Sequence, residues 1–451
     1  MILNRRRQFL VATLSAAVLS ACGGGSGSSA PAPADFRIAG GENQIFTDWT
    51  AASGVDYWLF FKKGSTVSIG GKDNLFRIDI TTPYVLRELD LDTQYAMTLN
   101  GRKDGGEGGP GVPAQTTTTR LAGSDWLAGD STSLTSLAAS APLYGVAYGQ
   151  ITNSSNTYGY VAVGANGNIL RTADTDAARG YGHIDATTGL VKPIVWQKPA
   201  TSTVPASVTL RGVTYASNLE MFCAVGSNGT IVTSTNIDTW TLLPGSPTTA
   251  SLNGIATSGS AFVAVGDNGT LLYSTNGTSW SPPSSVSASI AGVTLRGVTY
   301  SAAGIWVAVG SGGTVLTSTN GTTWTATTLS GDLTAVSAIG LVDGNNNTVY
   351  TYVAVGADGT VLTSNNASTW STTTLAGEFH SVQASTRLVA VGANGVVFTR
   401  DTLAGTPWIQ RNAPLGNATM YGITRGLATY GQNIYTAVGV HGGNGASIFS
   451  Y

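Results

Sequence analysis

Charged side chains are scarce in this sequence. Only 10% of its 451 residues are Asp, Glu, Lys or Arg, against about 25% in ordinary soluble domains. Lys and Arg together number 22 and the acidic residues 24, so no basic stripe is available to follow a phosphate backbone. Nucleic acid is therefore not an expected partner. The low charge does not indicate disorder, because 42% of the residues are hydrophobic.

Signatures of catalysis and metal binding are also missing. The sequence holds three His and two Cys, and it contains no Gly-x-Ser-x-Gly, His-Glu-x-x-His or Cys-x-x-Cys. We therefore predict no catalytic residue, no cofactor and no metal centre. One alternative stays open, because residues 174–185 and 343–347 place oxygen ligands at alternate positions, as calcium prefers. Neither loop has the full calcium-binding pattern.

Beyond the N-terminus, no apolar run is long enough to cross a bilayer. What the chain has instead is glycine, at 59 positions, together with many Ser, Thr and Asn residues. Short β-strands joined by tight turns need Gly and Asn at positive φ and β-branched residues between them. The composition therefore predicts a β-rich folded protein, and the length predicts two or more domains.

The first 22 residues have the pattern of an export signal. A basic segment ending at Arg7 precedes an apolar stretch from Phe9 to Leu19. Leu19-Ser20-Ala21-Cys22 then resembles a bacterial lipobox. The resemblance implies that Cys22 is acylated and becomes the N-terminus of the mature protein, so Cys223 is not expected to have a disulfide partner.

Residues 23–34 are rich in Gly, Ser and Pro, which predicts a flexible tether. With Gly23 after the acylated Cys, the lipobox resemblance implies a lipid anchor in the outer membrane, facing the periplasm or the cell surface. The membrane is then contacted through this lipid only. Arg6-Arg7 also resembles a twin-arginine signal, so that route and general secretion both stay open.

Residues 35–119 resemble a fibronectin type III domain. The resemblance rests on Trp49, on the apolar strand Tyr57–Phe61, and on Leu89–Tyr95, which matches the tyrosine corner of that family with Leu91 in place of Pro. It implies a small β-sandwich in which the Tyr95 ring is buried and its hydroxyl caps nearby backbone. Such modules act as spacers or weak adhesion sites.

A repeat fills the remainder of the chain, residues 120–451. The tripeptide Ala-Val-Gly occurs seven times, and each copy is followed by a turn pair such as Asn228-Gly229 or Asn268-Gly269. Such pairs between apolar runs are typical of β-hairpins. The Val-Ala-Val strands are apolar on both faces, so each repeat predicts a sheet packed between two neighbouring sheets. Radial stacking meets that requirement, and the sequence predicts a seven-bladed β-propeller.

Tryptophan positions indicate how the ring closes. Seven Trp residues are expected on outermost strands, one in each blade: Trp126, Trp196, Trp240, Trp280, Trp324, Trp370 and Trp408. After the last Ala-Val-Gly the chain has room for only one more strand. Residues 124–127, which precede the first inner strand, are therefore predicted to complete the last blade and remove its open edge.

The segment Ser318–Trp324 and its copies resemble degenerate Asp-box repeats of sialidase-type and photosystem II assembly-factor-like propellers. The resemblance implies a structural turn whose side chains cap a hairpin. Sialidase chemistry would need three Arg, a Tyr–Glu nucleophile pair and an acid, yet this region holds only Glu220 and Glu378 as glutamates. A sialidase-like carbohydrate-active enzyme stays the alternative to a binding protein.

Candidate ligand-binding residues stand just before the Gly-Val of each inner strand. This position varies and stays polar while the rest of the repeat is nearly constant; it is occupied by Tyr144, Arg211, Asn253, Arg296, Thr334, His380 and Tyr421. Because inner strands begin at the central opening, these side chains are predicted to ring it. Arg211 and Arg296 together favour an anionic group. Solvation of a water-filled channel is the plainer interpretation.

Insertions between strands give a second candidate surface on the opposite face, with Tyr158, Tyr181 and His183. The favoured function is a non-enzymatic, monomeric envelope lipoprotein. Its propeller is expected to bind a protein or glycan partner, or to support assembly of a complex.

Overall fold

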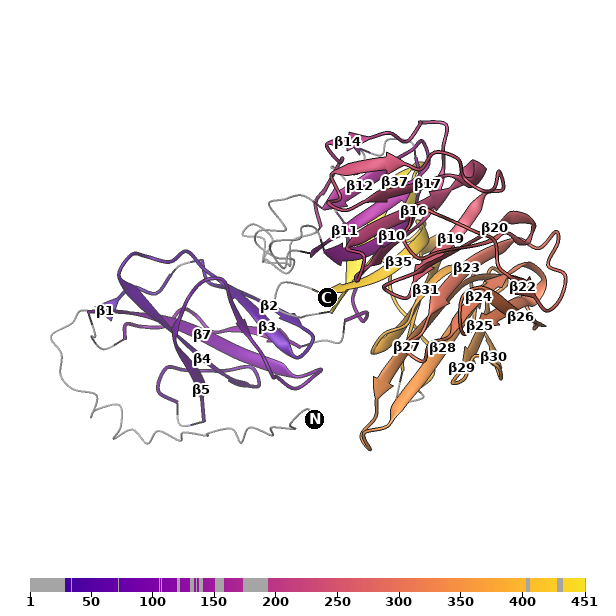
Figure 1. Ribbon diagram of the computed structural model, residues 1–451. Coiled ribbons are helices and arrows are strands. Elements are labelled where there is room, and N and C mark those ends of the chain that lie inside the picture. Colours follow the sequence, from indigo (N-terminus) through magenta and orange to yellow (C-terminus); the bar gives the residue numbers. More distant parts are fainter. Residues whose placement is uncertain are drawn as a thin grey trace. The chain divides into compact units, whose positions relative to one another are not determined.

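The structure is a computed structural model. It describes residues 29–33, 35–71, 73–104, 106, 108–119, 122–129, 134, 136–137, 141–150, 158–172, 194–402, 406–427 and 433–450. Within these ranges the regular secondary structure is almost all β-strand, and no helix among them is long and apolar enough to cross a membrane. Contacts divide the described residues into two units, 29–119 and 122–450 (Figure 1). The predicted export signal, Cys22 and most of the tether lie outside the described residues.

The first unit consists of two antiparallel sheets. One has the order β1-β7-β4-β5 with β8 also on β7, and the other has the order β2-β3-β6. The strands are β1 (Ser29–Ala30), β2 (Arg37–Gly41), β3 (Gln44–Asp48), β4 (Val55–Lys63), β5 (Leu75–Ile80), β6 (Tyr84–Leu86), β7 (Gln94–Lys103) and β8 (Gln115–Thr118).

The apolar core of this unit contains Trp49 and Tyr95, which are 2% and 3% exposed. The backbone N–H of Asp90 donates to the Tyr95 hydroxyl over 3.1 Å. Tyr95 thus has the buried ring and the capping hydroxyl that its sequence context predicts. Membership of the fibronectin type III family stays a prediction.

The second unit is a seven-bladed β-propeller. Blade one consists of β10 (Leu143–Gln150), β11 (Tyr158–Gly164), β12 (Ile169–Thr172) and β13 (Trp196–Gln197). Blade two contains β15 (Leu210–Ala216), β16 (Met221–Gly226), β17 (Ile231–Ser234) and β18 (Thr239–Leu242). Blade three consists of β19 (Leu252–Thr257), β20 (Phe262–Gly266) and β21 (Leu271–Ser274). Blades four and five are β23 (Leu295–Tyr300), β24 (Trp306–Gly310), β25 (Thr314–Ser318) and β26 (Thr323–Thr328); and β27 (Leu333–Val342), β28 (Thr348–Gly356), β29 (Thr360–Ser364) and β30 (Ser371–Thr374).

Blade six is β31 (Phe379–Gln383), β32 (Arg387–Gly392), β33 (Val397–Asp401) and β34 (Ile409–Gln410). Blade seven is β35 (Thr419–Leu427), β36 (Asn433–His441) and β37 (Asn444–Ser450), completed by β9 (Leu127–Ala128) from the other end of the unit. The inner strands adjoin one another in the order β10-β15-β19-β23-β27-β31-β35, and β35 lies against β10. The ring is therefore closed.

Closure follows the predicted route. Leu127 and Ala128 of β9 pair antiparallel with Phe449 and Ile448 of β37. Trp126, immediately before β9, is 6% exposed and packs among apolar residues of blades six and seven. Because β9 and β37 come from opposite ends of the unit, their pairing removes the open edge of the last blade.

Extra strands correct one sequence expectation. In blades two and four, the short strands β14 (Thr201–Ser202) and β22 (Ser285–Val286) pair in parallel with β18 and β26. The Trp-bearing strands of these two blades are therefore not outermost. Each extra strand follows the preceding blade in the chain. It pairs with the Trp-bearing strand of the blade that it joins and becomes the outermost strand of that blade.

The turns after Ala-Val-Gly adopt the predicted backbone in most blades. Both residues of the pair have positive φ at, for example, Asn228-Gly229 (55° and 67°); the short 3-10 turns are η1 (Ser227–Gly229), η2 (Asp267–Gly269), η3 (Ser311–Gly313) and η4 (Ala393–Gly395). The expectation is wrong in two blades. In blade five, only Gly359 of the pair Asp358-Gly359 has positive φ, at 82°. It is also wrong in blade seven. There Asn444 and Gly445 lie in β37, and Gly442 and Gly443 take the positive φ values, because β36 continues past its Ala-Val-Gly.

The turn before Trp324 has the structural role implied by its sequence. The Asn320 Oδ1 accepts the backbone N–H groups of Thr322 and Thr323 at 2.9 and 2.8 Å. The Trp324 ring is 1% exposed, and its Nε1 donates to the Gly321 carbonyl over 3.0 Å. The copies ending at Trp240, Trp280 and Trp370 repeat these bonds. The turn therefore stabilises the blade and carries no chemistry of its own.

Candidate functional site

A β-bulge occurs at the same point of every inner strand. In blade one, Leu143 lies opposite Gly164 and Gly145 lies opposite Val163, so Tyr144 between them has no partner on β11. The register shifts in the same way in the other six blades. The residues left unpaired are Tyr144, Arg211, Asn253, Arg296, Thr334, His380 and Tyr421, the seven candidates from the sequence. A bulge re-aims the side chain that it carries.

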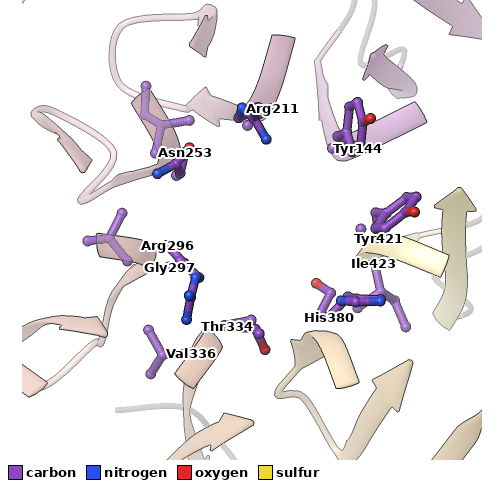
Figure 2. A pocket seen from close by; sticks show the side chains of 18 of the residues that line it. Tyr144, Arg211, Asn253, Arg296, Gly297, Thr334, Val336, His380, Tyr421 and Ile423 are labelled. Carbon is purple, nitrogen blue, oxygen red and sulfur yellow. The ribbon is translucent and has the colours of Figure 1, made fainter. Parts of the chain in front are cut away.

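These seven side chains line one central cavity of about 730 Å³. Figure 2 shows them around a common opening, each contributed by a different blade. The wall below them is formed by the following residues of the inner strands, among them Val146, Val213 and Ile255. The structure therefore brings the seven predicted residues together. It assigns no ligand to them.

Glycine after the bulge lets neighbouring inner strands approach closely. A Cβ built on Gly297 would lie 2.9 Å from the Cα of Ala335 in the next blade, and one on Gly145 would lie 2.9 Å from the Arg211 carbonyl oxygen. A Cβ on Gly422 would meet the Tyr144 carbonyl at 2.7 Å. Glycine at these positions therefore allows adjacent inner strands to pack closely, while Ala335 and Ser381 stand at the same position in blades five and six.

Three of the seven residues donate a side-chain hydrogen bond to the backbone of the next blade. Asn253 Nδ2 donates to the Leu295 carbonyl over 3.0 Å, and Arg296 Nη1 donates to the Leu333 carbonyl over 3.1 Å. Thr334 Oγ1 donates to the Phe379 carbonyl over 2.9 Å. Each acceptor is the residue immediately before the bulge residue of the following blade. These contacts join blades three to six.

The other four residues form an arc across blades six, seven, one and two. The rings of His380 and Tyr421 lie 5.1 Å apart, and those of Tyr421 and Tyr144 also lie 5.1 Å apart. The Arg211 guanidinium carbon lies 5.9 Å from the centre of the Tyr144 ring. We call Arg211, Tyr144, Tyr421 and His380 the aromatic arc. It presents three rings and one cation to the cavity.

Burial shifts the pKa values of two residues of the aromatic arc, His380 and Tyr421. Burial lowers the pKa of His380 below its ordinary value, and the Glu378 carboxylate, 3.6 Å from Nε2, opposes that shift in part. Burial also raises the pKa of Tyr421 above its ordinary value. Both shifts favour the neutral forms of the His380 and Tyr421 rings.

The two arginines do not act as an equivalent pair, which corrects the sequence expectation. Arg296 Nη1 lies 2.8 Å from Asp332 Oδ1, so its charge is already matched. Among the described residues that line the cavity, the carboxylates are Asp332 and Asp267. Asp267 Oδ1 accepts a hydrogen bond from Asn253 over 2.8 Å. Neither acid was predicted from the sequence. Asp332 stands where blades two, three and four have Thr209, Ser251 and Thr294, and where blade six also has an acid, Glu378; that variation was the available signal.

The second candidate surface is only partly described. Tyr158 is 41% exposed and stacks on Tyr148, with ring centres 5.7 Å apart. Tyr181 and His183 lie outside the described residues, as does the loop 174–185.

The loop 343–347 is a hairpin tip. Asp343 Oδ1 accepts the backbone N–H groups of Asn345 and Asn347, each at 2.9 Å, and these bonds lower the pKa of its carboxyl. The described part of the chain contains no group of three His, Cys, Asp or Glu residues placed to hold a metal ion. Cys223 is a buried free thiol whose pKa is raised by burial.

No protein-family model and no curated protein matches this sequence. Solved structures that are similar to it include the following two. One is described as YCF48 bound to a D1 peptide, at 15% identity and a TM-score of 0.48, covering 73% of this chain and 95% of that one. The other is YCF48 from Cyanidioschyzon merolae, at 15% identity and a TM-score of 0.46, covering 72% of this chain and 98% of that one.

Proposed function

We propose that this protein is a non-enzymatic binding protein that captures a segment of a partner protein in the central cavity of its propeller. One observation carries the proposal: seven bulges aim side chains of five residue types into one cavity, while the rest of the repeat stays nearly constant. A structural position in a repeat is expected to be uniform. Variation confined to the cavity rim favours recognition.

The residue types at the rim favour a protein partner. Tyr and Arg dominate the binding energy of protein interfaces, because they offer large contact areas with a polar end. Tyr144, Tyr421 and Arg211 lie side by side in the aromatic arc. The cavity volume of about 730 Å³ is in the range of sites that enclose a small ligand or a few side chains.

The rim does not favour hydrolysis of glycosides. Such chemistry needs two carboxyl groups free to act as acid and as base or nucleophile. The described carboxylates of the cavity are engaged with Asn253 and with Arg296.

We further propose that the protein works in the cell envelope. Leu19-Ser20-Ala21-Cys22 supports acylation of Cys22 and an outer-membrane anchor. Residues 23–34 would then act as a tether and residues 35–119 as a spacer of the fibronectin type III kind. Together they would hold the propeller, residues 120–451, at a distance from the membrane.

Co-purification from detergent-solubilised membranes tests this function. The wild-type chain is expected to retain a partner protein that a Tyr144→Ala/Tyr421→Ala variant loses, because that variant removes the two central rings of the arc. Tyr158→Ala is the matched control, since it removes an exposed Tyr from the opposite face. Equal recovery of the partner by the wild type and the double variant would contradict the proposal, as would turnover of synthetic sialosides by the wild type.

A further inference from the structure

Arg211 and Arg296 occupy the same bulge position in blades two and four, within nearly identical segments, 209–215 and 294–300. Their neighbours differ: the bulge residue of the preceding blade is Tyr144 for Arg211 but Asn253 for Arg296, and that of the following blade is Asn253 for Arg211 but Thr334 for Arg296. A further difference bears on their charge. The residue just before the next inner strand is Asp332 beside Arg296 but Ser251 beside Arg211. The repeat therefore contains one arginine with an internal carboxylate and one without.

The consequence is visible in the contacts of the two side chains. Arg296 is fixed by Asp332 at 2.8 Å and by the Leu333 carbonyl at 3.1 Å. Arg211 is exposed, and among the described residues its side chain has only the contact with the Tyr144 ring. An Arg guanidinium can bind a carboxylate through two parallel hydrogen bonds. That capacity of Arg211 is unused within the described chain.

We infer that the cavity binds a carboxylate of the partner at Arg211, in the position that Asp332 takes on Arg296. This inference rests on the proposed function and names the part of the partner that is recognised. The carboxylate lies above Ser251, and the group next to it packs on the rings of Tyr144 and Tyr421. The recognised element is an acidic group adjoining a flat or apolar side chain.

Charge and hydrogen bonding favour a carboxylate over a phosphate. One unmatched guanidinium suits a monoanion, whereas a dianion would also face the carboxylates of Asp267 and Asp332 in the same cavity. The hydroxyl groups of Tyr144 and Tyr421 have no hydrogen-bond partner among the described residues, so they can donate to the same anion.

A pair of small probes tests the charge requirement. N-acetylphenylalanine carries a carboxylate beside a phenyl ring, and N-acetylphenylalaninamide is its neutral counterpart. In NMR titrations of the full chain, the acid is expected to bind about tenfold or more tightly than the amide, since a charge-assisted bond adds at least that factor. Arg211→Gln should reduce the affinity for the acid to that for the amide.

Exchanging the residues that differ between the blades gives a sharper test. Ser251→Asp supplies Arg211 with an internal carboxylate, so the preference for the acid should disappear. Asp332→Ser frees Arg296, so the stoichiometry for the acid should rise from one toward two. Melting temperatures close to that of the wild type show that the variants are folded.

Equal binding of acid and amide by the wild type would overturn the inference, and so would an undiminished preference in both Ser251→Asp and Arg211→Gln. Recovery of the partner protein separates this result from the proposed function. A partner that is lost in Tyr144→Ala/Tyr421→Ala but kept in Arg211→Gln would overturn the carboxylate site and leave protein capture in place.

Discussion

The Arg296 guanidinium and the Asp332 carboxylate lie 2.8 Å apart, and the two residues belong to the inner strand of blade four and to the segment that enters blade five. Their side chains are 30% and 49% exposed. In such a setting an ion pair adds little to stability, because solvent screens it. The ion pair matches the charge of Arg296, so that among the described residues lining the cavity Arg211 is the arginine without a carboxylate partner.

Loss of Trp126 is expected to weaken closure of the ring. Trp126 is 6% exposed among apolar residues of blades six and seven, and Trp126→Ala should lower the free energy of unfolding by about 3–5 kcal/mol. Urea denaturation followed by circular dichroism measures the change. Ile409→Ala is the control, because Ile409 is 46% exposed and its loss should change stability very little. Similar unfolding midpoints for the two variants would contradict the closure described above.

Gly297 is expected to tolerate no side chain. Gly297→Ala would place a Cβ 2.9 Å from Ala335 Cα and 3.1 Å from Val336 N, so blades four and five would have to separate, at a cost of about 1–3 kcal/mol. Gly344→Ala is the matched control, since no atom lies within 4 Å of its Cβ. Thermal unfolding of both variants tests the point. A Gly297→Ala protein as stable as Gly344→Ala would show that the spacing between blades four and five does not depend on this close approach.

The lowered pKa of His380 predicts that the stability of the protein depends on pH. Because its pKa is lowered in the folded state from an ordinary value of 6.5, the unfolded chain binds a proton more readily. Stability should therefore fall as the pH drops below about 6.5 and level off below the folded-state pKa. Denaturant midpoints between pH 7.5 and 5 measure this, and His380→Gln should reduce the slope. An unchanged slope in the variant would assign the effect to other groups.

Cys22→Ser tests the lipid anchor. The lipobox resemblance predicts that the wild-type protein fractionates with membranes, because several acyl chains together make release slow. The Ser variant should appear in the soluble fraction or stay uncleaved. Fractionation of the variant like the wild type would show that Cys22 does not carry the anchor.

The propeller could be predicted because its cause is local and repeated. Seven copies of Ala-Val-Gly and their turn pairs specify strands that are apolar on both faces, and such strands are stable only between other sheets. The same pattern located the seven cavity residues, because they are the variable position in an otherwise constant strand. Trp126 could be assigned to the last blade since its repeat was otherwise one strand short.

The different roles of the seven cavity residues could not be predicted in this way. The bulge, the fastening of Asn253, Arg296 and Thr334 to the next blade, and the neutralisation of Arg296 all depend on backbone and side chains from adjacent blades. Sequence shows Arg211 and Arg296 in nearly identical segments, so they look equivalent. The tertiary structure distinguishes them, because the carboxylate of Asp332 from the following blade lies 2.8 Å from the Arg296 guanidinium, whereas the described residues give Arg211 no ion pair.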